Sequence, residues 1–320
     1  MIHYRSFRNR DLPALAEIWR AQAPERALMQ PMSADLLEMH VLSKPYFDGA
    51  GLIVALDDDV PVGFAHAGFG PTDDQSSLST QWGVTCVVLV RPNYHRLGIG
   101  GELLARAEQY LRSRGAQVLY GGGIRPLNPF YLGLYGGSEL PGVMTSDAAA
   151  RRLYESHGYV EIDRCVVLQR ELGGFRPPVD RQQVQIRRRY AVQEIADPRL
   201  RTWWEACTYG GFDLTRFNLG EHDVGPSVAT ALLWTMGPLA ASWGIHAAGL
   251  IELEVDPAHQ RQGLATFLLG EAMRRFQVHG VSLFEAQTMC HNAAALALYR
   301  KLGFTEVDQG AVYRKQSDPG

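Results

Sequence analysis

The chain has 320 residues, which is long for one domain and sufficient for two domains that each bury their own core. Its residues are 46% hydrophobic and 20% charged, a balance that excludes an intrinsically disordered or fibrous protein. The formal net charge is only -3 and the two signs are well mixed, so we do not expect the basic surface that nucleic-acid binding requires.

Targeting and redox signals are weak in this sequence. The first residues alternate apolar and polar side chains, and no stretch approaches the roughly eighteen consecutive apolar residues of a membrane span. We therefore expect a cytoplasmic protein with no membrane partner. The four cysteines, Cys86, Cys165, Cys207 and Cys290, lack paired spacing, which predicts reduced thiols rather than a disulfide framework or a zinc site.

Taken in chain order, the first half alternates predicted strands and helices. Asp11 and Ser33 are the expected N-caps of the first two helices, and an Asp-rich turn separates the second and third strands. The pattern predicts strands at 3–7, within 51–70 (two strands), at 82–90, 117–122 and 159–169, and helices at 11–22, 33–42, 98–115 and 147–157.

The second half repeats the first. At a shift of 165 residues, Val90 aligns with Val255 and Gly98 with Gly263. A later block, 147–159, aligns with 292–304 at a shift of 145, so the first copy contains about twenty additional residues within 125–146. Prolines and glycines in this insertion predict an ordered surface loop without long regular elements.

The second copy begins near Val184 and ends with 304–315. Residues 173–182 have the proline, glycine and charge content of a linker. The sequence therefore predicts an N-terminal domain at 1–172, a linker at 173–182 and a C-terminal domain at 183–320.

Each copy places small residues at the start of the helix that follows the buried strand. The first turn of a helix has unpaired N–H groups and a positive dipole end, and small side chains let phosphate oxygens approach them. Gly98 and Gly100 in the first copy, and Gly263 and Ala265 in the second, therefore predict phosphate cradles. The sequence does not match two other phosphate-binding motifs. A dinucleotide-binding fingerprint would need a third glycine where Leu103 stands, and a nucleotide-binding P-loop would need a lysine followed by Ser or Thr, which neither copy has.

Two motifs together carry a family resemblance. The stretch from Gln260 to Ala265 reads Q-x-x-G-x-A, and 292–304 reads N-x-x-A-x-x-L-Y-x-x-x-G-F. The paired motifs resemble the GNAT superfamily of acyl-CoA-dependent N-acyltransferases, and their presence in both halves is similar to tandem GNAT proteins. The resemblance implies two α+β domains, each a mixed, mostly antiparallel sheet flanked by helices, and transfer of an acetyl group from acetyl-CoA to a primary amine. It implies no metal.

The resemblance also implies roles for individual residues. A tyrosine at the position of Tyr299 protonates the departing thiolate, and Tyr154 is its counterpart in the first copy. The resemblance does not identify the general base, and Glu252, on the strand before the second cradle, is our first choice from its position. In the second copy the implied coenzyme A contacts are Leu253, Val255, Gln260, Arg261, Gln262, Gly263, Leu264, Ala265, Thr266 and Asn292. In the first copy they are Val88, Val90, His95, Arg96, Leu97, Gly98, Ile99, Gly100 and Gly101.

The copies differ at several motif positions. The second keeps Gln260 and Asn292, whereas the first has His95 and Asp147, so we expect the second copy to be the more certain active site. Three alternatives stay open for the first copy: it binds coenzyme A, it catalyses, or it has lost both roles. Glu254, His246, His259 and a water chain stay open as alternatives to Glu252 as the base.

Three questions stay open at this level. The insertion is read either as a lid or as filler of the groove between the domains. A coenzyme A sensor or structural protein is the alternative to an enzyme. The acceptor is a small molecule or a peptide amine that the sequence does not identify, and the oligomeric state is not predicted.

Overall fold

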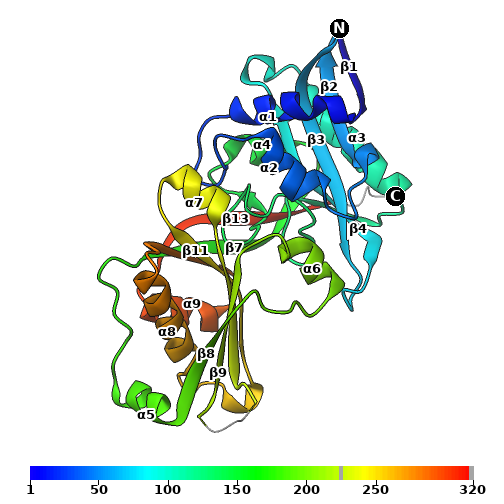
Figure 1. Ribbon diagram of the computed structural model, residues 1–320. Coiled ribbons are helices and arrows are strands. Elements are labelled where there is room, and N and C mark those ends of the chain that lie inside the picture. The colour runs from blue at the N-terminus through cyan, green and yellow to red at the C-terminus, as the bar shows by residue number, and fades with distance from the viewer. Residues whose placement is uncertain (223–225, 317–320) are drawn as a thin grey trace.

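The structure is a computed structural model that describes residues 1–222 and 226–316 (Figure 1). Its elements alternate much as the sequence predicts. The strands are β1 Ile2–Ser6, β2 Leu52–Asp57, β3 Val60–Pro71, β4 Leu78–Val90, β5 Val118–Gly121, β6 Val143–Met144, β7 Tyr159–Glu171, β8 Tyr190–Ala196, β9 Leu214–Glu221, β10 Ala229–Thr235, β11 Ala247–Val255, β12 Leu283–Met289 and β13 Thr305–Lys315.

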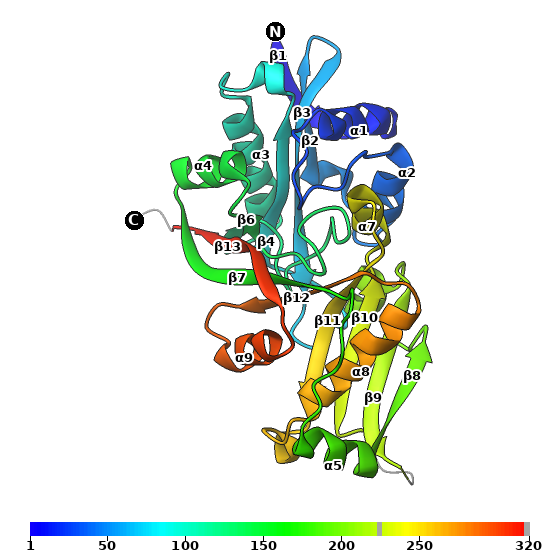
Figure 2. The same cartoon turned by 90° about the vertical axis from the view of Figure 1, so that its left-hand side faces the viewer.

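Helices lie on both faces of these strands (Figures 1 and 2). They are α1 Leu12–Arg20, α2 Ala34–Leu37, α3 Ile99–Ser113, α4 Ala148–Ser156, α5 Arg181–Arg189, α6 Trp203–Tyr209, α7 Gly237–Trp243, α8 Leu264–Val278 and α9 Ala293–Lys301. Short helical turns are η1 Asn9–Asp11, η2 Glu38–Leu42, η3 Gly49–Gly51, η4 Pro92–Tyr94 and η5 Pro257–His259. Within the described residues, no helix is both long and apolar enough to cross a membrane.

The strands form one sheet that runs through both halves. Its order is β1-β2-β3-β4-β5-β13-β7-β12-β11-β10-β9-β8, with β6 paired to β13. The order is symmetric about the β13–β7 pair. All pairs are antiparallel except β4 with β5 and β11 with β12, which are parallel. Each half is therefore a mixed, mostly antiparallel sheet flanked by helices, as predicted.

The two halves exchange their last strands. Strand β7, at the end of the first half, pairs with β12 along Cys165–Glu171. Strand β13, at the end of the second half, pairs with β5 and β6 of the first half and with β7. Figure 2 shows β7 and β13 side by side between the two halves. The sequence boundaries at 173–182 stay a prediction, and the sheet is continuous across them.

The chain at the predicted start of the second copy, near Val184, is helical before it becomes a strand. Residues Arg181–Arg189 form α5, and the strand begins at Tyr190. The helix starts at 181 because the Asp180 side chain accepts a hydrogen bond of 2.8 Å from the Gln183 amide. This N-cap, with glutamine three residues later, is a sequence signal that the repeat alignment overlooked.

The two predicted caps of the first half have different outcomes. Ser33 Oγ accepts a bond of 3.2 Å from the Leu36 amide, so that prediction is confirmed. Asp11 does not cap α1 with its side chain, so that prediction is wrong. Its carboxylate instead accepts from Arg5 Nη1 at 2.6 Å and from the Arg8 amide at 2.8 Å. The guanidinium of Arg5 and these bonds hold the pKa of Asp11 below its usual value despite its burial.

The 125–146 insertion is ordered but does not lie on the surface, so the surface-loop prediction is wrong. Phe130 and Leu134 are buried in a core cluster that also contains Trp19 of the first half and Trp234 of the second. The reason is its apolar content, because Leu, Phe and Tyr side chains gain free energy by leaving water. The insertion fills the groove between the halves, one of the two alternatives that the sequence left open.

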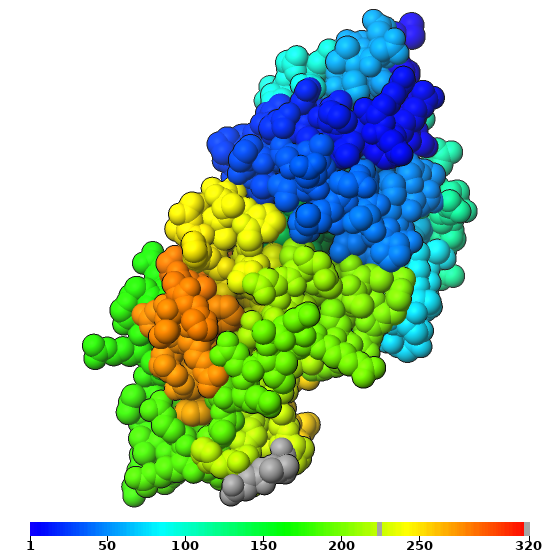
Figure 3. Space-filling model, in the orientation of Figure 1, coloured from blue at the N-terminus to red at the C-terminus, as the bar shows by residue number. Residues whose placement is uncertain are grey.

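Further contacts join the halves at the surface, where residues near the N-terminus meet α6 and α7 of the second half (Figure 3). Lys44 Nζ donates to the Cys207 carbonyl at 2.6 Å, and Trp243 Nε1 donates to the Arg26 carbonyl at 3.0 Å. The Gln30 amide donates to Ser242 Oγ at 3.1 Å. The halves are thus joined by side chains as well as by exchanged strands.

Candidate active site

The two predicted cradles have the same backbone. Arg96 and Arg261 have φ of 63° and 58°, and Gly98 and Gly263 both have φ of 78° immediately before α3 and α8. Glycine adopts this left-handed conformation at little cost, so the turn itself requires glycine at both positions. In each copy the left-handed turn leads directly into the following helix, as the cradle hypothesis expects.

His95 and Gln260, which differ in the sequence, make the same contact. His95 Nε2 lies 2.8 Å from the Val90 carbonyl, and Gln260 Nε2 donates to the Val255 carbonyl at 3.1 Å. Both side chains tie the loop back to the last residue of the preceding strand. The substitution therefore preserves the loop geometry.

The strands before both cradles separate from their parallel neighbours. Strand β4 pairs with β5 only along Trp82–Thr85, and β11 pairs with β12 only from Ala247 to Gly249. Each pairing ends next to a bulge, at Cys86 in β4 and at Ile251 in β11. Beyond the bulge neither strand pairs with its parallel neighbour, so the ladder of main-chain hydrogen bonds on that side ends there.

A cavity of about 850 Å³ lies beside the first cradle. All its lining residues belong to the first half, and it extends from the 95–100 loop along β4 to the segment after α1. A volume of this size is typical of small-molecule sites. The predicted residues that line it are Val88, Val90, His95, Arg96, Gly98, Ile99, Gly100 and Tyr154.

Two predicted residues of the first copy lie outside this lining. The side chain of Leu97 is largely exposed to solvent. Gly101 faces α4, where an added Cβ would lie 2.5 Å from His157 Nε2. The small residue at 101 is therefore explained by helix packing.

Tyr154 lies at the bulge of β4. Its ring is 2% exposed, and its hydroxyl donates to the Thr85 carbonyl at 2.9 Å. Burial raises the pKa of Tyr154, so the hydroxyl keeps its proton at neutral pH and is a donor. Burial likewise raises the pKa of the Cys86 thiol, which keeps this cysteine uncharged and a poor nucleophile.

Two carboxylates line the cavity that the sequence did not single out as site residues. Asp147 caps α4 by accepting from the Ala150 amide at 2.9 Å, and burial raises its pKa. Glu25 follows α1, and burial together with the charges of Asp147 and Asp308 raises its pKa. Both groups hold protons more tightly than ordinary carboxylates, which suits a role in proton transfer.

The bulge of the second half has different surroundings. Arg125, at the start of the insertion, donates to the Ile251 carbonyl at 3.1 Å. The Ser138 amide donates to Glu285 Oε1 at 2.6 Å, and Gln287 Nε2 donates to the Glu139 carbonyl at 2.9 Å. The insertion therefore lies against β11 and β12 where the two strands separate.

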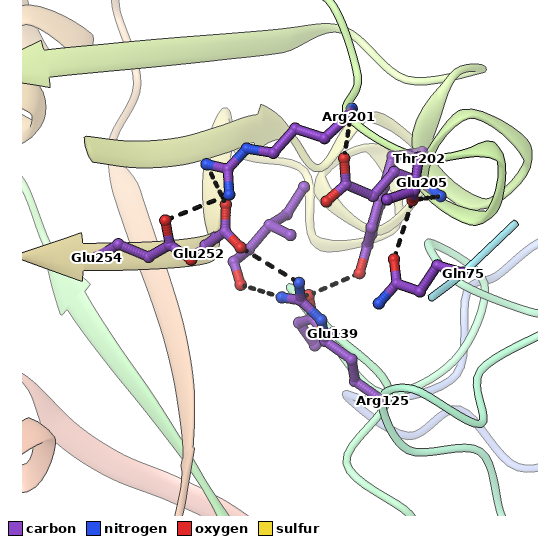
Figure 4. A network of polar contacts seen from close by, with 10 residues as sticks. Gln75, Arg125, Glu139, Arg201, Thr202, Glu205, Glu252 and Glu254 are labelled. Atoms are coloured by element: carbon purple, nitrogen blue, oxygen red, sulfur yellow. Dashed lines mark hydrogen bonds and ion pairs between the residues drawn. The ribbon is translucent and has the colours of Figure 1, made fainter. Parts of the chain in front are cut away.

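Glu252 and Glu254 share one face of β11, as the sequence predicts. Both form ion pairs of 3.2 Å with Arg201, and Glu252 also lies 3.4 Å from Arg125 Nη2 (Figure 4). Each carboxylate oxygen of Glu252 thus faces a guanidinium group. The predicted base is therefore held in ion pairs at the interface between the two halves.

Glu139 belongs to the same network (Figure 4). It accepts a bond of 3.1 Å from the Tyr209 hydroxyl and lies 3.9 Å from Arg125. Burial raises the pKa of Glu139 to about 7 although Arg125 lowers it. Its charge state therefore changes near neutral pH.

The other predicted residues of the second copy lie on β11, in the loop before α8, at the start of α8, and at or on α9. Asn292 caps α9 by accepting from the Ala295 amide at 3.1 Å, as Asp147 caps α4, and Tyr299 is buried with a raised pKa caused by burial. Gln183 Nε2 of α5 donates to the Gly263 carbonyl at 3.4 Å. Leu264 and Thr266 are buried; Leu253, Val255, Gly263 and Ala265 are partly buried; Gln260, Arg261 and Gln262 are exposed.

Two glycine-initiated cradles beside separating strands, with a tyrosine at the bulge of the first, define the class of the protein as an acyltransferase of tandem architecture. The model of the acetyltransferase (GNAT) family matches residues 12–136 and 185–304. The chain therefore belongs to the GNAT family, with one copy in each half.

Relatives and solved structures agree with this assignment. The chain is 42% identical over 59 residues to the ribosomal protein bS18-alanine N-acetyltransferase of Escherichia coli K12, covering 18% of this chain and 40% of that protein. It is 36% identical over 92 residues to the mycothiol acetyltransferase of Beutenbergia cavernae, covering 29% of each. The matches thus span less than half of these relatives.

A solved tandem GNAT protein from the clavulanic acid biosynthesis pathway has a similar fold. It aligns over 100% of both chains with a TM-score of 0.68 and 14% sequence identity. At this identity the similarity concerns the fold alone. The recognition of a tandem GNAT acyltransferase from sequence is confirmed.

Proposed function

We propose that the protein transfers an acetyl group from acetyl-CoA directly to a primary amine, and that the reaction takes place in the cavity of the first half. The observation that supports this most is the cavity of about 850 Å³, which connects the 95–100 cradle, the separated part of β4, Tyr154 and two carboxylates. The matching residues of the second half lie against the insertion and α5.

Coenzyme A would be held mainly by main-chain groups. The first amides of α3 and the positive end of its dipole suit the pyrophosphate, and Gly100 leaves them accessible. Val88 and Val90 line the cavity on the separated strand and would pair with the pantetheine amides. The thioester would then lie near the bulge at Cys86.

The chemistry follows from the groups at this bulge. Attack of the amine on the thioester develops negative charge on the carbonyl oxygen and then on sulfur. Tyr154 would donate a proton to the departing thiolate, since its raised pKa keeps it protonated. Glu25 would accept a proton from the amine, and its raised pKa makes it a better base than an ordinary carboxylate.

A direct transfer is favoured over an acetylated enzyme. The cavity contains the cysteine Cys86, whose pKa is raised by burial. A protonated thiol is a weak nucleophile. The amine would therefore attack acetyl-CoA itself.

We propose a supporting role for the second half. The sequence favoured Tyr299 and Glu252 there, and their catalytic roles stay predictions. Arg125 on the Ile251 carbonyl and the ion pairs of Glu252 favour a half that stabilises the fold instead of catalysing. The proposal therefore gives the second half the structural role that the sequence analysis left open as an alternative to catalysis.

The acceptor would be a cationic amine. Glu25 and Asp147 give the cavity two acidic side chains, which would attract an ammonium group before it loses its proton. A small molecule and a peptide N-terminus both satisfy this requirement. The substrates named for the relatives are not carried over, since the matches cover less than half of those proteins.

The experiment is a calorimetric titration of acetyl-CoA into the full chain and two matched variants, Gly100→Trp and Ala265→Trp. Both positions are the second residue of their helix, and a Cβ at 100 would meet Leu153 at an ordinary 3.6 Å. We expect one molecule per chain, binding lost in Gly100→Trp and retained in Ala265→Trp. Loss in Ala265→Trp alone would place the site in the second half.

Binding without turnover would support the sensor alternative. Thiol release from acetyl-CoA, measured with a panel of primary amines, separates the two functions. Release that depends on the amine supports an enzyme. Tight binding without release from any amine of the panel, or binding that survives both tryptophan substitutions, would contradict the proposal.

A further inference from the structure

The two halves carry equivalent side-chain clusters just before α4 and α9. In the first half, Thr145 Oγ1 donates to Asp308 Oδ1 at 2.7 Å, and Ser146 Oγ donates to Asp308 Oδ2 at 2.6 Å. Asp308 Oδ1 also accepts from the Gln309 amide at 2.7 Å. Two hydroxyls and one amide thus satisfy this carboxylate.

At a shift of 145 residues, Thr145 and Ser146 correspond to Cys290 and His291. Asp308 of β13 corresponds at the same shift to Asp163 of β7, because the halves exchange their last strands. The backbone arrangement is repeated, since Asp163 Oδ1 accepts from the Arg164 amide at 2.7 Å. The Cys290 amide donates to the Arg164 carbonyl at 2.8 Å, which fixes the turn beside β7. The hydroxyls, however, are replaced by a thiol and an imidazole.

These side chains converge on one carboxylate oxygen. Cys290 Sγ lies 3.9 Å from Asp163 Oδ1, and His291 Nδ1 lies 3.5 Å from the same atom. The three donor atoms are all within 4.8 Å of one another. A thiol is a weak hydrogen-bond donor and the distances are long, so hydrogen bonding alone explains this convergence poorly.

The distances match a metal site better. With zinc bonds of about 2.3 Å to sulfur and about 2.1 Å to nitrogen and oxygen, a tetrahedral site has edges of about 3.4 Å to 3.6 Å. The separations of 3.9 Å and 3.5 Å to Asp163 Oδ1 exceed these edges by a few tenths of an ångström at most, and the thiol and the imidazole lie within 4.8 Å of each other. Rotation of the two exposed side chains would close these gaps. Sulfur, imidazole nitrogen and carboxylate oxygen are the ligands that zinc prefers.

We propose that Asp163, Cys290 and His291 bind a Zn²⁺ ion, with water in the fourth position. Cys290 and His291 are exposed, so the ion reaches them from solvent. On binding, the Cys290 thiol releases its proton to solvent and coordinates as thiolate. The site joins β7 to the turn before α9 and is independent of the acetyl-transfer proposal.

The test measures zinc binding by the untagged full-length protein after treatment with a chelator. Equilibrium dialysis against ZnCl₂ is expected to give one ion per chain. The double variant Cys290→Thr/His291→Ser installs the residues of the first half, which the same turn already accommodates. We expect it to fold and to lose affinity by at least about 100-fold.

Two further measurements identify the ligands. Cys207→Ser, which alters a partly exposed thiol elsewhere, is expected to bind zinc like the parent protein. Co²⁺ in place of zinc is expected to give a thiolate charge-transfer band that is absent in Cys290→Thr. Unchanged zinc affinity in the folded double variant, or no bound zinc in the parent protein, would overturn the proposal.

Discussion

Cys86 and Ile251 are the bulge residues of the two halves, and their surroundings differ. Cys86 borders a cavity, whereas the carbonyl of Ile251 accepts a hydrogen bond from Arg125. The half whose motifs depart further from the family pattern is thus the half whose bulge borders a cavity. The comparison teaches that a motif specifies local backbone, while distant segments decide whether a site is open.

The largest expected effect concerns the two tyrosines. Tyr154→Phe removes the proposed proton donor, and we expect kcat to fall about 100-fold, or about 2.7 kcal/mol in activation free energy. The matched variant Tyr299→Phe is expected to keep kcat within about twofold. Thiol release at saturating acetyl-CoA measures both, with thermal unfolding as the control for the lost bond to Thr85. A loss confined to Tyr299→Phe would reverse the comparison.

A second prediction tests the interface network through Glu139. Its pKa is raised from 4.5 to about 7, so the folded state binds the proton more tightly than the unfolded state. The resulting stability is fully present below pH 4.5 and is lost as the pH rises through about 7. Glu139→Gln should remove this dependence, which amounts to on the order of 1 to 3 kcal/mol.

Denaturant unfolding at several pH values between 4.5 and 8 measures that difference. Glu254→Gln, on the exposed side of the same network, serves as the control and should leave the pH dependence unchanged. Parallel stability profiles for the parent protein and Glu139→Gln would show that Arg125 keeps Glu139 ionised throughout.

Glu25→Gln tests the proposed base and should lower kcat about tenfold, equal to about 1.4 kcal/mol. In the parent protein the rate should fall as the pH drops through the raised pKa of Glu25, because the base must be ionised. The variant should lack this acid limb. Glu38→Gln, an exposed carboxylate outside the cavity, is the control. An unchanged pH profile in Glu25→Gln would assign the base to another group.

The smallest effect is expected for His95→Gln, which gives the first cradle the residue of the second. Because His95 and Gln260 contact equivalent carbonyls, we expect the affinity for acetyl-CoA to change less than about threefold. His95→Ala removes the contact and should weaken binding up to about tenfold. Calorimetry measures both. Equal losses in the two variants would mean that the imidazole itself contacts the ligand.

The elements that the sequence predicted well depend on local patterns. The strands and the helices after each cradle follow from side-chain periodicity and from the small residues that open those helices. Periodicity gave no signal for the exchange of β7 and β13. The periodicity of a strand shows which of its faces is buried, but the strand with which it pairs depends on packing across the whole sheet. The cluster around Asp163 was missed for the same reason, since its aspartate lies 127 residues from Cys290.

The sequence indicated part of the lining of the cavity in the first half. The first-copy loop residues follow from their motif, whereas Glu25 lies in a segment without a motif and reaches the cavity only through the fold. The buried position of the insertion was signalled by its Leu, Phe and Tyr content, which outweighs its prolines and glycines. The residue types of the insertion thus indicated that it is buried, but they did not indicate that the two halves of the molecule cover it.

The exchanged strands also affect how the chain folds during synthesis. Residues 1–172 include β7 but not β13, so the edge of β5 has no partner until residues 305–315 leave the ribosome. An unpaired edge strand invites association with other chains. Vectorial synthesis therefore leaves the first half incomplete until β13 has been made, and a fragment that stops before β13 should aggregate when expressed alone.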